Sequence, residues 1–155
     1  AFNQKSNFLE ASVLIPVLTY KKDGKLKTFK TALNEKLQTK DFNLVVHSMV
    51  HSDLALPVGY LFEKNGFKIG FSGDTCWHDG LNAFIEFGDK LVIECNFVHK
   101  TGNGHISIEE LESSEMVQIK KKDIYLTHLC KESAYKAKEL GYNILSDGDD
   151  LCFKL

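Results

Sequence analysis

Asp74 and His128 are the residues whose type and position point most directly to chemistry. Each follows a short apolar segment, since Asp74 closes IGFSGD and His128 closes IYLTH. Because binding sites in open α/β sheets gather at the carboxyl ends of strands, we expect these two side chains to lie close together. A carboxylate and an imidazole at one sheet edge can hold a divalent metal ion. The alternative for Asp74 is structural, as the cap of a turn or of the following helix.

His105 is a further candidate, because it lies in the glycine-containing segment GNGHIS directly before a predicted helix. A flexible loop at a helix N-terminus suits an anion, so His105 could meet a phosphate or a developing oxyanion. From its local sequence alone, a solvent-exposed loop histidine is the simpler interpretation.

His47 and His51 are four residues apart, a spacing that would bind one zinc ion from a helix. A β-type run precedes them and Pro57 follows, so we predict a loop instead. One of the two is then expected to be a metal ligand and the other its neighbour. His78 and His99 stand in no supporting pattern, and we expect them on the surface or around the site.

The elements that would position these residues form a β-rich first half followed by alternating strands and helices. Asn65-Gly66 between two apolar runs is the strongest hairpin signal. Ser107 with Glu110 forms a capping box, and Gly141 ends the last helix. This order predicts an α/β fold with a mixed β-sheet and helices packed on one face. The predicted strands are 11–20, 26–31, 44–46, 59–63, 67–71, 90–94, 124–126, 143–145 and 151–155, and the predicted helices are 107–119 and 131–140.

Length and composition fit one globular domain over residues 1–155. The net charge of −2 argues against a protein that binds nucleic acid through bulk positive charge. The run Lys120–Lys122 is therefore interpreted as a solvated helix end that complements the helix dipole. No apolar run is long enough to span a membrane, and the polar start lacks the core of a signal peptide.

Four cysteines, at positions 76, 95, 130 and 152, form no C-x-x-C pair. Their neighbours are mostly apolar, so we expect free, half-buried thiols in a reducing, cytoplasmic compartment.

Taken in order, these motifs resemble the C-terminal half of a metallo-β-lactamase-fold hydrolase, and the ribonuclease Z and phosphodiesterase branch most of all. Each motif is weak alone, but the ordered set is specific. The set comprises His51 before Gly59-Tyr60, N-G-x-K-I at 65–69, S-G-D-T at 72–75, D-x-L-V-x-E at 89–94, G-H-x-S at 104–107, L-T-H-L at 126–129 and D-G at 147–148.

The resemblance implies one half of an αββα sandwich and a hydrolase with two zinc ions in its complete site. By this resemblance His51 is a ligand of the first zinc, with His47 as the alternate. Asp74 bridges both metals, and His128 is a ligand of the second zinc. His105 resembles the loop histidine that stabilises the transition state or protonates the leaving group. Asp74 and His105 are thus the candidate catalytic residues.

The family motif H-x-H-x-D-H, which supplies most zinc ligands, is absent from this sequence. We therefore expect a fragment or C-terminal domain, completed by the missing N-terminal half or a second chain, and a homodimer is one such arrangement. We expect the chain to be part of a zinc-dependent hydrolase that cleaves small phosphodiesters or RNA through a metal-activated water. The alternatives are a metal-free, catalytically incomplete scaffold or interaction domain and a thioester- or β-lactam-type hydrolase.

Overall fold

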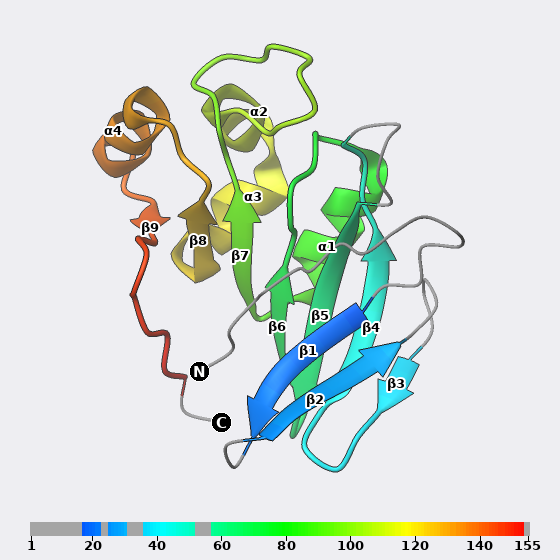
Figure 1. The fold of residues 1–155 in the computed structure, drawn as a ribbon. Helices are drawn as coiled ribbons and strands as arrows, with labels where there is room; N and C mark the ends of the chain where they lie inside the picture. The colour runs from blue at the N-terminus through cyan, green and yellow to red at the C-terminus, as the bar shows by residue number, and fades with distance from the viewer. Residues whose placement is uncertain (1–16, 23–24, 31–35, 52–56, 154–155) are drawn as a thin grey trace.

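A seven-stranded mixed sheet forms the centre of the computed structural model, which describes residues 17–22, 25–30, 36–51 and 57–153 (Figure 1). Its strand order is β3-β4-β5-β6-β7-β8-β9, and a separate antiparallel pair, β1-β2, precedes it. The strands are β1 Val17–Lys22, β2 Lys25–Lys30, β3 Lys36–Gln38, β4 Asn43–Ser48, β5 Val58–Lys64, β6 Phe67–Phe71, β7 Lys90–Glu94, β8 Ile124–Thr127 and β9 Asn143–Ile144. The helices are α1 Asp79–Phe87, α2 Ile108–Ser113, α3 Glu115–Lys120 and α4 Lys131–Glu139, with a 3₁₀ turn η1 at Lys121–Asp123.

The sheet changes from antiparallel to parallel at β6. Strands β3 to β6 pair antiparallel, and β6 to β9 pair parallel. As a result β4, β6, β7 and β8 all run in one direction, and their carboxyl ends lie at the same edge of the sheet (Figure 1). The predicted mixed α/β sheet is confirmed.

The hairpin between β5 and β6 confirms the strongest local prediction. Asn65 and Gly66 both have positive φ, 53° and 82°, as the two central residues of a type I′ turn require. The turn fixes the register, in which Lys64 pairs with Phe67 and Leu61 with Gly70.

The four helices pack on one face of the sheet, as expected (Figure 1). Alternating strand residues supply that side of the core, because successive side chains point to opposite faces. Gly70 leaves room for the α1 residue Phe84, since a Cβ there would lie 2.7 Å from the ring. The fully buried side chains of this core include Leu81, Phe84, Ile85, Leu91, Ile93, Ile124 and Leu126.

The single helix predicted over residues 107–119 is wrong, because the chain forms two short helices there. The capping box at Ser107 and Glu110 is present, and it begins α2. Ser113 donates its hydroxyl to the carbonyl of Glu110, and the side chain of Ser114 accepts the Val117 N–H. Such serine-to-backbone bonds compete with helix continuation, so Ser114 ends α2 and begins α3.

The interpretation of Lys120–Lys122 as a solvated helix end is wrong for Lys120, whereas Lys122 is exposed as expected. Lys120 Nζ donates to three carbonyls at the end of α1, those of Ile85, Glu86 and Gly88, at 2.5–2.9 Å. The ammonium therefore complements the dipole of a neighbouring helix. Only a structure in which α1 exists reveals this contact, and no helix was predicted there from the sequence.

Three other predictions meet the structure in part. Residues 151–153 lie in no strand, and the ring of Phe153 packs against Phe67 and Tyr125. Positions 11–16, 23–24, 31 and 154–155 of the predicted turn and strands lie outside the described residues. All four cysteines are unpaired thiols, with Cys95 buried and Cys152 exposed.

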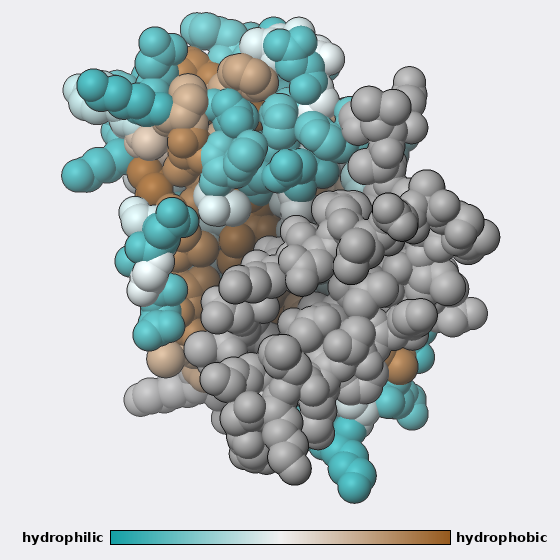
Figure 2. Space-filling view, viewed as in Figure 1, coloured by the Kyte–Doolittle hydropathy of each residue, from teal (hydrophilic) through white to brown (hydrophobic). Residues whose placement is uncertain are grey.

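The second face of the sheet carries its own apolar cluster, which comprises Phe42, Leu44, Val46 and Phe62. Figure 2 shows apolar surface in the region of β7 and β8, on the face turned away from the helices. None of the described helices combines the length and the apolar character needed to cross a membrane.

Candidate metal centre

Four strands deliver polar side chains to one edge of the sheet. Strand β4 leads to His51, β6 to Asp74 and β8 to His128, while Glu94 is the last residue of β7. These strands run in the same direction, so their carboxyl ends meet. The predicted proximity of Asp74 and His128 is a direct consequence of this topology.

Asp74, His105 and His128 form a group that could hold a metal ion. One donor atom from each side chain lies within 4.8 Å of the other two. Asp74 and His128 are exposed, and His105 is partly buried. Two imidazole nitrogens and one carboxylate oxygen form the donor set of many catalytic zinc sites, which leave the fourth position for water. The residues present therefore fit a divalent metal ion.

The backbone of His128 supports a functional interpretation. Its φ is +57°, in the left-handed region that few residues other than glycine occupy. Hydrogen bonds hold both flanks, from Cys95 N–H to the Thr127 carbonyl and from Cys130 N–H to the Asn96 carbonyl. A conformation of this kind persists where the surrounding structure enforces it, and such residues cluster at functional sites.

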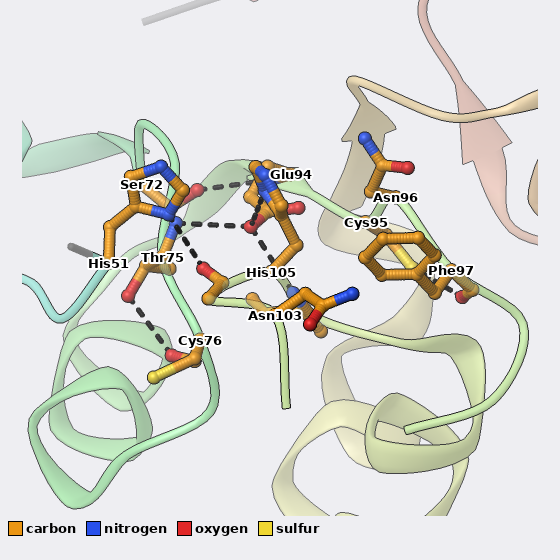
Figure 3. Close-up of polar contacts among 12 residues, drawn as sticks. His51, Ser72, Thr75, Cys76, Glu94, Cys95, Asn96, Phe97, Asn103 and His105 are labelled. Atoms are coloured by element: carbon orange, nitrogen blue, oxygen red, sulfur yellow. Dashed lines mark hydrogen bonds and ion pairs between the residues drawn. The ribbon is translucent and has the colours of Figure 1, made fainter. Parts of the chain in front are cut away.

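Glu94 contacts His105 and fixes its ring (Figure 3). The carboxylate is 1% exposed, and its Oε1 accepts hydrogen bonds from the backbone N–H groups of Thr75 (3.0 Å) and Ile106 (3.2 Å). His105 Nδ1 lies 3.1 Å from the same oxygen. Because Oε1 is the acceptor, Nδ1 carries the proton and His105 Nε2 keeps a free lone pair for an ion.

The other oxygen of Glu94 is unpaired among the described residues, and burial shifts the pKa values of both Glu94 and His105. Oε2 is buried and has no hydrogen-bond partner in the described part of the chain. Burial raises the pKa of Glu94 to about 7, against the lowering effect of the two backbone donors. Burial, followed by the proximity of His51, lowers the pKa of His105. A neutral imidazole is the form that binds a metal ion.

The three histidines of the site lie side by side. The His105 ring centroid is 4.7 Å from that of His51 and 5.1 Å from that of His128. His51 is thus adjacent to the group but is not one of its three members. The structure brings together Asp74, His105 and His128, and the assignment of His51 as a metal ligand stays a prediction.

His47 occupies a different environment from His51. It belongs to β4, where its ring contacts Phe84 of α1 with centroids 5.4 Å apart. Burial lowers its pKa, and its Nε2 has no partner among the described residues. The structure therefore places the alternate ligand on the helix-covered face.

The two histidines without a pattern also lie outside the metal group. His78 directly precedes α1, with its Nε2 buried, and His99 is exposed, 3.7 Å from a carboxylate oxygen of Glu109. The role of Glu94 was not predicted from the sequence, although one signal was present. A carboxylate that closes the apolar run KLVI must be buried or lie at a strand end.

Comparison with solved structures relates this fold to known proteins. The metallo-β-lactamase-fold protein YhfI from Bacillus subtilis is 19% identical, with a TM-score of 0.59 over 77% of this chain and 53% of its own. The Zn²⁺-bound PqqB from Methylobacterium extorquens is 18% identical, with a TM-score of 0.57 over 79% and 51%. The short form of human tRNase Z is 15% identical, with a TM-score of 0.53 over 77% and 46%.

No family model matches the sequence, and no curated protein matches it by sequence. The similarity is therefore one of fold, shown by the arrangement of the backbone. This chain spans about half the length of each of the three solved structures. It has about half of a metallo-β-lactamase fold.

Proposed function

We propose that this chain supplies part of the active site of a zinc-dependent hydrolase that acts on phosphodiester bonds. The observation that carries the proposal is the group formed by Asp74, His105 and His128 at the carboxyl edge of the sheet, with donor atoms within 4.8 Å of one another. The Zn²⁺ bound to PqqB supports the choice of metal. Human tRNase Z, by its name a nuclease of tRNA, supports the choice of bond.

Asp74 and His128 would hold the ion, because both are exposed at the edge and carry donors that zinc accepts. A bound zinc ion lowers the pKa of a coordinated water and polarises a phosphoryl oxygen. The neighbouring polypeptide must then keep the donor side chains in place. The Cys95 and Cys130 backbone bonds do this for His128, and Glu94 does it for His105.

His105 has two candidate roles, and they predict different variants. As a third zinc ligand it offers the lone pair of Nε2, which its bond to Glu94 leaves free. As an acid it would protonate the leaving oxygen from Nε2, with Glu94 stabilising the charged ring. In the first role the variant His105→Ala loses zinc, and in the second it keeps zinc and loses only hydrolysis.

The remaining zinc ligands would come from outside this sequence. The motif H-x-H-x-D-H is absent, and the chain spans about half of the compared structures. We propose that the N-terminal half of the fold, or a second chain, completes the site and covers the apolar surface at β7 and β8 (Figure 2). A cytoplasmic location is part of this proposal, because four free thiols suit a reducing compartment.

The span of the chain, about half of the compared structures, also favours a second candidate, a metal-free scaffold or interaction domain. Half of a sandwich fold leaves one sheet face to be covered by a partner. A thioester- or β-lactam-type hydrolase would use the same metal donors as a phosphodiesterase and would differ from it only in substrate.

Zinc content per chain is the experiment that separates these functions. The 155-residue chain is dialysed at neutral pH without chelator, and its metal is measured by elemental analysis. The proposal predicts about one zinc ion per chain in the wild type and in the exposed-surface control His99→Ala, and none in His128→Ala. Hydrolysis of bis(4-nitrophenyl) phosphate should follow zinc content. Absence of zinc from the wild type would favour the scaffold.

A further inference from the structure

The carbonyl of Gly104 binds the ring of His51. The distance from His51 Nδ1 to the Gly104 oxygen is 2.8 Å. A carbonyl oxygen can only accept, so His51 Nδ1 must carry a proton, and in the neutral ring Nε2 then carries the lone pair. Nε2 is then the only ring atom of His51 that can bind an ion.

We propose that Gly104 is a positioning residue, whose carbonyl selects the Nδ1–H tautomer of His51 and so prepares this ring as an Nε2 donor beside the metal group. The inference rests on the proposed metal-dependent function. It concerns a residue whose own side chain can bind nothing, and it assigns the effect to the backbone.

The close approach explains why a glycine precedes His105. A Cβ on Gly104 would lie 2.7 Å from the His51 carbonyl oxygen and 3.0 Å from His51 Nδ1. The φ of Gly104 is +80°, which L-residues with side chains rarely adopt. Any larger residue would therefore move the carbonyl away from the ring or displace the backbone of His51.

One peptide unit also connects two histidines of the site. The Gly104 carbonyl and the His105 N–H belong to the same planar group, so they move together. His105 is in turn fixed by Glu94, and its ring lies 4.7 Å from that of His51. A shift of this peptide plane would therefore change the positions of both rings together.

The other end of the loop is anchored at some distance from the histidines. Lys100 N–H donates to Glu109 Oε2 (3.1 Å), and Glu109 N–H donates to the Val98 carbonyl (3.1 Å). Between Lys100 and Gly104 the chain is exposed, from Thr101 to Asn103.

Gly102 offers a matched control in the same loop. Its φ is +71°, close to that of Gly104, but a Cβ there would meet nothing within 4 Å. The substitution Gly102→Ala thus adds backbone strain alone. Gly104→Ala adds similar strain together with the clash at His51, so the difference between the variants isolates the contact.

The test measures which nitrogen of His51 is protonated. Long-range ¹H–¹⁵N spectra of the imidazole groups are recorded for the metal-free chain at neutral pH, and the His51 signals are assigned with His51→Ala. The proton should reside on Nδ1 in the wild type and in Gly102→Ala. In Gly104→Ala the two tautomers should mix. Zinc affinity should fall by about 10–100-fold in Gly104→Ala only, as for loss of an outer partner of a metal ligand.

Two outcomes would overturn the inference. One is a wild-type His51 protonated on Nε2, which needs no variant and no metal. The other is a folded Gly104→Ala, verified by circular dichroism, that keeps both the wild-type tautomer and the wild-type zinc affinity. If the wild type bound no zinc, the proposed function would fail, but the tautomer measurement would still decide the role of Gly104.

Discussion

Among the described residues, polar side chains are paired at one end of the seven-stranded sheet, whereas at the other end several gather with donor atoms left free. At the amino ends of the parallel strands, Lys90 pairs with Asp123, and Lys120 binds three carbonyls at the end of α1. At the carboxyl ends, Asp74, His105 and His128 bring their donor atoms together, and Glu94 Oε2 is buried without a partner among the described residues.

Positive φ values mark the same contrast. Outside glycine, the described residues with positive φ are Asn65 and His128. Asn65 is a preferred residue for its turn, and it closes the β5–β6 hairpin near the amino ends. His128 stands at the carboxyl end of β8, where no turn requires a histidine. Since unpaired buried groups and strained conformations destabilise a fold, their concentration at one end indicates that this end is arranged for a ligand.

The largest expected effect is the pH dependence that Glu94 gives to stability. Burial raises its pKa from 4.5 to about 7, so the folded chain binds more protons than the unfolded chain between these values. The contribution of Glu94 to the free energy of unfolding is therefore fully present below pH 4.5 and is lost as the pH rises through 7. The total loss is about 3 kcal/mol. Urea unfolding with a chelator, at several pH values, measures this slope.

Glu94→Gln should remove that contribution. The free energy of unfolding of this variant, minus that of the wild type, should therefore be higher at about pH 8 than at about pH 4.5. His47 and His78 titrate in the opposite sense, because burial lowers their pKa values and destabilises the fold below pH 6.5. Their effect cancels in the difference between the two proteins. Burial also lowers the pKa of His105, and because its Nδ1 contacts Glu94 Oε1, its titration contributes to the difference. Glu63→Gln, at an exposed ion pair of the other end, is the control. Parallel pH profiles for Glu94→Gln and the wild type would contradict the contrast between the ends.

The second effect is stabilisation by metal. Zinc that binds only the folded chain should raise the free energy of unfolding by about 2.7 kcal/mol when its free concentration is about 100 times the dissociation constant. Asp74→Asn should lose this gain, because it removes the carboxylate from the group at the carboxyl ends. Thermal unfolding with and without zinc measures the gain. An undiminished gain in Asp74→Asn would show that zinc binds elsewhere.

The third and smallest effect belongs to the opposite end. Lys120→Met removes the ammonium that binds the carbonyls of Ile85, Glu86 and Gly88. We expect the free energy of unfolding to fall by about 2 kcal/mol, since hydrogen bonds of a charged donor stabilise more than neutral ones. The zinc-dependent gain should be unchanged. Lys122→Met, at an exposed neighbour, is the control and should stay within about 0.5 kcal/mol of the wild type in urea unfolding.

Local sequence determined much of this molecule. Asn65-Gly66 specified its hairpin, Ser107 with Glu110 specified the start of α2, and apolar runs specified most strands of the sheet. The strand-end positions of Asp74 and His128 followed from the same runs, because parallel strands end at one edge. These features depend on residues close together in sequence, so periodicity and turn chemistry suffice to predict them.

Tertiary structure decided the rest. His51 meets Gly104 across 53 positions of sequence, and Lys120 reaches the end of α1 across 32–35. Glu94 joins His105 across 11 positions and Thr75 across 19. Which of His47 and His51 approaches the site depends on where β4 ends, because alternation within the strand turns His47 toward Phe84. Local propensity contains no information on such contacts, since they form only when distant segments pack together.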